Sequence, residues 1–118
     1  MYSVLRLVLP TAMQTDLKRF KPFCSNGAPS FVNGRISLSV FEGPDWSRHI
    51  VAISQLIDSL EKEFGESLGQ TIGGVIDVAV DWEDYNANLL TELTIPPTLI
   101  GTLGRLKLAV TISIYGGE

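Results

Sequence analysis

Residues 45–65 read DWSRHIVAISQLIDSLEKEFG, the longest regular pattern in the chain. Apolar side chains recur in it at steps of three and four residues, a spacing that places them on one face of a helix. These side chains are Trp46, Ile50, Ile53, Ile57, Leu60 and Phe64. Asp45 or Ser47 can accept a hydrogen bond from the first-turn amides, and Gly65 can take the left-handed conformation that ends a helix. The stretch therefore predicts one main helix over about residues 46–64.

Shorter segments on both sides of this helix alternate apolar and polar residues, which is typical of strands covered on one face. The predicted strands are residues 2–9, 35–41, 75–82, 89–95 and 105–115. Pro96 and Pro97 introduce a short second helix over about residues 97–103, because proline is tolerated in a first turn. From residue 35 onward the order is strand, helix, strand, strand, helix, strand. We therefore expect an α+β fold with a ferredoxin-like split β-α-β sheet and an extra N-terminal strand.

The length and composition indicate one α+β domain spanning residues 1–118. The chain has 118 residues, 45% of them hydrophobic, which is enough for a single core. Its only cysteine, Cys24, suits a reducing compartment. No apolar run reaches the roughly 18 residues needed to cross a membrane, and the N-terminus lacks the basic start of a signal peptide. We expect a cytoplasmic protein without a membrane partner.

Acidic residues are concentrated in the second half of the chain. Residues 63–104 contain no Lys, Arg or His but seven Asp or Glu residues, in a chain whose net charge is −4. A surface of this kind repels the phosphate backbone of nucleic acids and attracts positively charged proteins. We therefore expect no nucleic-acid partner and consider a basic protein partner.

Three segments resemble one known family: HIVAISQLIDSL at residues 49–60, GGVIDVAV at 73–80 and LTELTIPPTLIGTLGRLKLAVTISIYG at 90–116. Over about residues 36–116 the chain resembles a bacterial domain-of-unknown-function family (number 4279). In that family such a helix leads to a strand, a short helix marked by leucine and proline, and a terminal strand. The resemblance implies an α+β sheet domain and assigns no functional residue. Some small acidic domains of this appearance also resemble immunity proteins, which neutralise a co-encoded toxin.

Catalytic and metal-binding patterns are weak in this sequence. His49, the only histidine, excludes sites with two histidines, and we expect it to be partly exposed on the main helix. Cys24 could act as a nucleophile only with His49 as its base. The turn DWEDYNAN at residues 81–88 gathers oxygen ligands but has Asn86 where a calcium loop requires glycine. We expect no cofactor, no metal and no catalytic residue, and favour a protein that is not an enzyme.

The first functional hypothesis is a non-enzymatic protein-interaction module, such as an immunity-type inhibitor of a basic bacterial toxin or nuclease. Aromatic residues contribute strongly to protein interfaces, and opposite charges accelerate association. The chain combines both features in one short segment. The predicted partner-binding residues are Asp81, Trp82, Glu83, Asp84 and Tyr85.

The alternative hypothesis is a small-ligand-binding domain or minor enzyme that uses the polar face of the sheet. Strand alternation predicts that residues of both charge signs point to that face. They are Arg35, Asp77, Asp81, Lys107, Ser113 and Tyr115. The same face could instead pair two copies of the chain in a homodimer.

Overall fold

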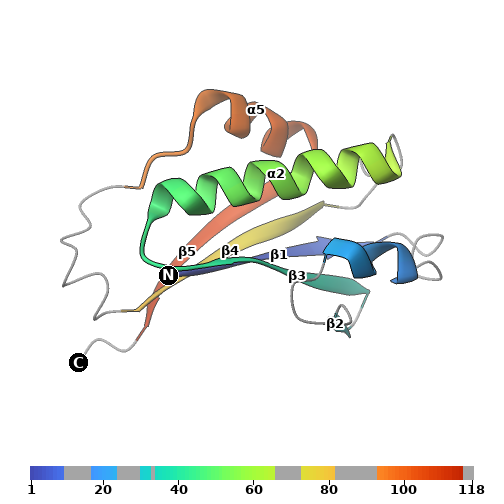
Figure 1. Cartoon of the computed structure of the whole chain (residues 1–118), viewed down its shortest axis with the longest axis horizontal. Coiled ribbons are helices and arrows are strands. Elements are labelled where there is room, and N and C mark those ends of the chain that lie inside the picture. Colours follow the sequence, from blue (N-terminus) through green and yellow to red (C-terminus); the bar gives the residue numbers. More distant parts are fainter. Residues whose placement is uncertain (10–16, 24–29, 33, 66–72, 82–92, 116–118) are drawn as a thin grey trace.

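A computed structural model of the chain describes residues 1–9, 17–23, 30–32, 34–65, 73–81 and 93–115. Within these residues, five strands form one sheet, and two α-helices lie together on one side of it (Figure 1). The elements in chain order are β1 (Tyr2–Val8), the 3-10 helix η1 (Leu17–Phe23), β2 (Ser30–Val32), β3 (Arg35–Glu42), α2 (Trp46–Phe64), β4 (Gly73–Asp81), α5 (Pro97–Arg105) and β5 (Leu108–Tyr115). The predicted α+β class, main helix, short second helix and N-terminal strand are confirmed.

The strand order is β2-β3-β1-β4-β5, with the N-terminal strand at the centre of the sheet. β1 runs antiparallel to both β3 and β4, so β3 and β4 run parallel to each other on either side of it. α2 joins these two strands and completes a split β-α-β unit, as expected for a ferredoxin-like sheet. α5 then connects β4 to β5, which pair in parallel. The sheet is therefore mixed, and the strand that divides the β-α-β unit is the first in the chain.

α2 forms because both its ends are capped and one of its faces is apolar. The Asp45 carboxylate accepts a hydrogen bond from the Ser47 amide at 3.0 Å, and Gly65 ends the helix with a φ of 55°. Phe20 of η1 stacks on Phe64 with ring centroids 4.5 Å apart, which closes one end of the core. The buried residues of α2 are His49, Ile53, Ile57, Leu60 and Phe64. Among the described residues, no helix is long and apolar enough to cross a membrane.

The core lies between the two helices and one face of the sheet. Leu5 of β1 pairs in register with Leu38 of β3 and Ile76 of β4, and all three side chains are buried. Because successive strand residues point to opposite faces, Arg6 and Asp77 lie on the other side of the sheet. We name the side away from the helices the open face. The molecule therefore has one apolar sheet face under helices and one face that carries most of its strand polar groups.

Residues 93–95 do not form a strand, which corrects the prediction of a strand at 89–95; residues 89–92 lie outside the described residues. The Thr94 carbonyl oxygen accepts a hydrogen bond from Trp46 Nε1 at 2.8 Å, and Pro96 has no amide hydrogen to donate to a neighbouring strand. Leu93 and Ile95 pack against the core instead. This segment therefore contacts the start of α2 rather than extending the sheet.

The chain turns sharply between α5 and β5, so β5 begins at Leu108 and not at residue 105 as predicted. Lys107 takes a left-handed φ of 59°, and its amide donates to the Gly104 carbonyl oxygen at 3.2 Å. Turns of this kind are a common way to end a helix. Lys107 is therefore placed outside the strand, immediately before its first residue.

Candidate functional site

Asp81 is the one predicted partner-binding residue within the described part of the chain. It is exposed at the end of β4 and pairs in register with Tyr115 at the end of β5. The Tyr115 side chain is 55% exposed. The acidic segment therefore starts beside an exposed aromatic ring. Outside the described residues lie Trp82, Glu83, Asp84 and Tyr85.

Exposed apolar side chains extend from Tyr115 along β5. Ile112 is 43% exposed and Ile114 is 50% exposed, although both lie on the sheet face that the helices cover. α5 has nine residues and β5 has eight, so the helix spans roughly 14 Å and the strand roughly 26 Å. Leu108, at the start of β5, is only 8% exposed. We name Ile112, Ile114 and Tyr115 the apolar end of β5.

The open face carries five of the six residues of the alternative hypothesis. They are Arg35, Asp77, Asp81, Ser113 and Tyr115. Arg35 pairs with Val8, which pairs with Gly73 at the opposite end of β4 from Asp81. Gly73 and Asp81 are the two ends of a nine-residue strand, so they are roughly 26 Å apart. Lys107 lies in the turn before β5. The six residues are therefore spread along the sheet rather than gathered at one point.

Arg6 and Asp77 form an ion pair on the open face that the sequence reasoning missed. Arg6 Nη1 donates to Asp77 Oδ2 across the β1–β4 pair, and the two side chains are 37% and 26% exposed. Asp77 Oδ1 is buried and has no hydrogen-bond partner among the described residues. The signal in the sequence was Arg6, a charged residue within a mostly apolar strand. Its partner Asp77 lies on a distant segment, and no local pattern indicates that the two residues meet.

His49 is fully buried, which corrects the prediction of a partly exposed helix histidine. Its Nε2 donates to the Gly43 carbonyl oxygen at 2.8 Å, because a carbonyl oxygen can only accept. Its Nδ1 lies 2.8 Å from Ser3 Oγ. Burial lowers the pKa of His49, because a charged imidazolium is disfavoured away from water. The ring is therefore neutral, and Nδ1 accepts a hydrogen bond from the Ser3 hydroxyl.

Ser3 and His49 have the atom types of a nucleophile and its base, but both side chains are 0% exposed. Phe41 meets the imidazole edge-on with centroids 4.8 Å apart, and Trp46 stacks on it at 6.0 Å. A substrate cannot reach the Ser3 hydroxyl past these rings, so the pair joins β1 to the start of α2. Within the described residues no group of three His, Cys, Asp or Glu side chains could hold a metal ion. Cys24 lies outside the described residues.

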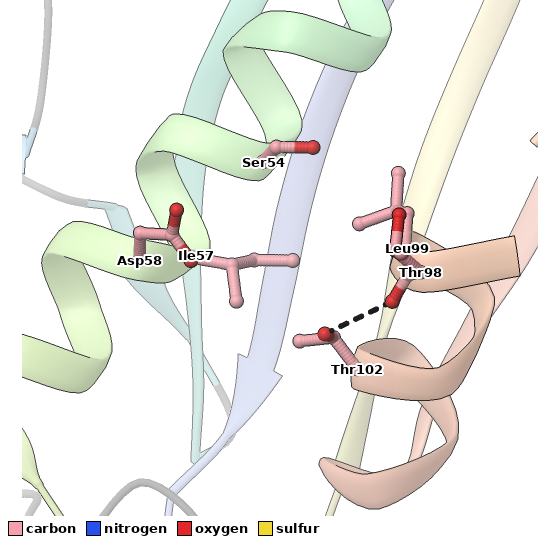
Figure 2. A pocket seen from close by; sticks show the side chains of 6 residues that line it. All are labelled: Ser54, Ile57, Asp58, Thr98, Leu99 and Thr102. Atoms are coloured by element: carbon pink, nitrogen blue, oxygen red, sulfur yellow. Dashed lines mark hydrogen bonds between the residues drawn. The ribbon is translucent and has the colours of Figure 1, made fainter. Parts of the chain in front are cut away.

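A small groove lies between α2 and α5, with a volume of about 190 Å³ (Figure 2). Ser54 and Asp58 of α2 and Thr98 of α5 border it, with Ile57 and Leu99 beneath. The Thr102 hydroxyl, also in the groove, donates to the Thr98 carbonyl oxygen at 3.2 Å. Pockets for small molecules usually exceed about 300 Å³. The groove is therefore too small to support a ligand site by itself.

A second hollow lies where the end of β3 meets the outer side of α2, with a volume of about 350 Å³. Its apolar lining includes Phe41, Val51 and Ala52, and Arg48 lies at its border. The Arg48 guanidinium is 3.8 Å from Asp45 Oδ2, so its charge already has a partner. Ligand pockets combine an apolar lining with several convergent polar groups. Among the described residues of this lining, Ser47 and Gln55 are the only uncharged polar ones, which gives little basis for recognition.

The chain matches no family model, and comparison with the curated proteins and with the solved structures finds no similar protein. The resemblance to the domain-of-unknown-function family stays a prediction from the three quoted segments. The candidate site therefore rests on geometry alone: an exposed carboxylate, an exposed aromatic ring and an uncovered strand end at one end of the β4–β5 pair.

Proposed function

We propose that this protein is a non-enzymatic interaction module that binds a basic protein through its acidic surface. We define the acidic surface as Asp81, Trp82, Glu83, Asp84 and Tyr85. The observation that carries the proposal is the pairing of exposed Asp81 with exposed Tyr115. Protein interfaces typically place an aromatic anchor at the centre and charged groups at the rim.

The charge distribution supports a basic partner. Residues 63–104 carry seven acidic residues and no basic ones. Charges of one sign on an exposed surface attract an oppositely charged protein over a distance of about 10 Å at 0.1 M salt. The attraction raises the association rate more than it slows dissociation. Binding should therefore be fast and should weaken as salt is added.

A toxin or nuclease is the class of partner that fits this chemistry best. A nuclease carries a positively charged surface, because it must bind a phosphate backbone. A small acidic protein covering that surface would prevent substrate binding. The assignment to an immunity-type inhibitor rests on size and charge, and the comparison is one of physical character rather than of shared residues.

Capture experiments with matched charge variants test the proposal. One variant combines Glu83→Lys with Asp84→Lys; its control combines Glu42→Lys with Asp58→Lys, which changes the net charge equally at two exposed positions elsewhere. Each protein is used as bait in lysate of its source, at low and then at high salt. We expect a basic protein that binds the unmodified chain and the control, elutes with salt and is lost from the first variant.

Purified partner and bait then give dissociation constants by calorimetry. Retention of the same partner by both variants would show that the acidic surface is not the binding face. Loss of the partner from both variants would show that only the net charge matters. Either result contradicts the proposal.

Binding of a small polar ligand on the open face is the second candidate function. Asp77 Oδ1 favours it, because a buried carboxylate oxygen without a partner can accept a hydrogen bond from a ligand. A metabolite screen by thermal shift tests it, since a ligand that binds the native state raises the unfolding temperature. The stabilisation should disappear in Asp77→Asn; stabilisation that persists there would place the ligand elsewhere.

A further inference from the structure

The two edges of the sheet differ in their protection against pairing with another chain. β2 forms one edge and has three residues, and short edge strands are a common protection. β5 forms the other edge and has eight residues, LAVTISIY, with no charge, no proline and no register shift against β4. Within the described residues no strand pairs with its outer side. β5 therefore presents a regular row of backbone donors and acceptors.

Two copies of β5 can pair antiparallel about a two-fold axis. The two-fold axis must relate one residue of β5 to its own copy, because only then do the side chains of opposite residues point to the same face of the sheet. The residues nearest the middle of β5 are Thr111 and Ile112. About Thr111, this side chain meets its own copy. On the face that the helices cover, Val110 meets the partner's Ile112 and Leu108 meets the partner's Ile114. These pairs join apolar to apolar, and the central pair joins hydroxyl to hydroxyl, combinations that favour sheet pairing.

The charges beside the two ends of β5 are also complementary in this arrangement. Lys107 precedes the strand and is exposed, whereas Asp81 lies beside its last residue, in register with Tyr115. Antiparallel pairing brings Lys107 of each copy to the end where the partner's Asp81 lies. In this same register Lys107 stands opposite the partner's Tyr115, and the partner's Asp81 lies on the next strand, two strand spacings or about 10 Å from Lys107. The seam therefore matches opposite charges although each copy has a net charge of −4.

We propose that two copies of this chain associate through their β5 edges into a symmetric dimer with one continuous sheet. A second copy fits this edge because the same strand supplies matching side chains and, at its two ends, matching charges. The dimer covers Ile112 and Ile114, which α5 leaves exposed. It does not rest on the proposed basic partner, because both partners in the interface are copies of this chain.

Sedimentation velocity of the purified chain over a wide concentration series tests the dimer. The decisive variant is Ile114→Lys; its control is Ile100→Lys on α5, because the two isoleucines are 50% and 55% exposed and neither supports the core. We expect the unmodified chain and the control to dimerise equally. In Ile114→Lys the dissociation constant should rise at least about tenfold, since a lysine replaces an apolar cross-strand contact twice. Circular dichroism checks that both variants fold.

A charge exchange across the seam separates this interface from others. Lys107→Glu and Asp81→Lys should each weaken the dimer, because each places like charges together. The double variant should regain most of the lost affinity, since it restores opposite charges in exchanged positions. A chain that is monomeric at every concentration would overturn the proposal. A dimer that ignores Ile114→Lys, or that is not rescued by the double variant, would also overturn it.

Discussion

The two ends of the β4–β5 pair use the same two strands but differ in packing. At the Gly74 end, Leu108 is 8% exposed, and a Cβ on Gly74 would overlap the carbonyl oxygen of Arg6. At the Asp81 end, Ile114 and Tyr115 are 50% and 55% exposed. Tight packing and exposed side chains are thus separated along one pair of strands. The first end has no room for an added atom, whereas the second can change its surface without disturbing the core.

The largest effect is expected from Gly74→Ala. The added methyl group would meet the Arg6 backbone and the Leu108 side chain, and backbone atoms in a central strand cannot move aside. The variant should lose about 3 kcal/mol of unfolding free energy or fail to fold. The matched control is Gly101→Ala in α5, where no atom beyond the adjoining residues and the helix's own backbone lies within 4 Å of the new methyl group. That control should gain up to about 1 kcal/mol, because alanine favours helix.

Urea unfolding of both glycine variants tests whether the Gly74 end of the β4–β5 pair is tightly packed. The midpoint should fall in Gly74→Ala and rise in Gly101→Ala at similar slope. Equal midpoints for Gly74→Ala and the unmodified chain would mean that the buried end is not tightly packed.

The next largest effect is expected from His49→Leu. Below the Asp81 end of the sheet, the buried side chain of His49 makes hydrogen bonds with Ser3 and with the Gly43 carbonyl oxygen. The change leaves the Gly43 carbonyl oxygen without its partner, and it leaves the Ser3 hydroxyl with only the longer contact to the Phe41 carbonyl oxygen, at 3.4 Å. Orphaned buried groups of this kind cost about 2 kcal/mol of unfolding free energy. Adding Ser3→Ala should recover part of the loss, since it removes a buried hydroxyl that has lost its shorter hydrogen bond. An additive loss in the double variant, measured by urea unfolding, would argue against the Ser3–His49 hydrogen bond.

The pH dependence of stability should report the same histidine with a smaller effect. Burial lowers the pKa of His49 in the folded state from its ordinary value of 6.5. Below pH 6.5 the unfolded chain therefore binds a proton that the folded chain does not bind. Unfolding free energy should fall by at most about 1.4 kcal/mol per pH unit as the pH drops from 6.5 towards the folded pKa, and should be flat above 6.5.

His49 is the only histidine, so its removal should flatten that pH range. Urea midpoints of the unmodified chain and of His49→Leu, measured between about pH 7.5 and 5, provide the test. A fall of equal size in both proteins would assign the pH dependence to carboxylates instead.

The smallest effects on stability are expected from two aspartates of β4. Asp77→Asn weakens a half-exposed ion pair with Arg6 and should cost no more than about 1 kcal/mol. Asp81→Asn, at the exposed end, should stay within about 0.5 kcal/mol of the unmodified chain. Thermal unfolding compares the two variants directly. A larger loss for Asp81→Asn would mean that the exposed end supports the fold after all.

Much of the fold follows from the periodicity of the sequence. The three- and four-residue spacing from Trp46 to Phe64 predicts α2, and the alternation around Ile36, Ile76 and Val110 predicts three strands. Which strands lie side by side in the sheet could not be predicted, because alternation identifies the buried face of a strand but not the strand that pairs with it. The central place of β1 and the parallel β4–β5 pair therefore appear only in the structure.

The candidate site was predictable only in part. Asp81 was predicted from its acidic surroundings, and the structure shows that this residue is exposed; its role stays a prediction. Ile112 and Ile114 lie on the inward face, in keeping with the alternation over residues 105–115, but their exposure depends on the length of α5, which sets how much of β5 is covered. His49 sits one turn after Trp46 and one turn before Ile53, a spacing that places it on the buried stripe. Because histidine is polar, the expected place was the surface. One of its two hydrogen-bond partners, Ser3, lies 46 residues away in the chain, and no local pattern indicates that contact.

In the proposed dimer, this molecule associates through the uncovered β5 edge. Hydrogen exchange of the purified chain at low and high protein concentration tests it directly. β3 supplies an internal reference, because β2 pairs only with its residues 35–37 and leaves residues 38–42 without a strand on their outer side in the described chain. Amides of β5 should exchange more slowly at high concentration, while those of β3 residues 38–42 stay unchanged. Exchange in β5 that does not depend on concentration, or protection that appears in β3 instead, would contradict the account.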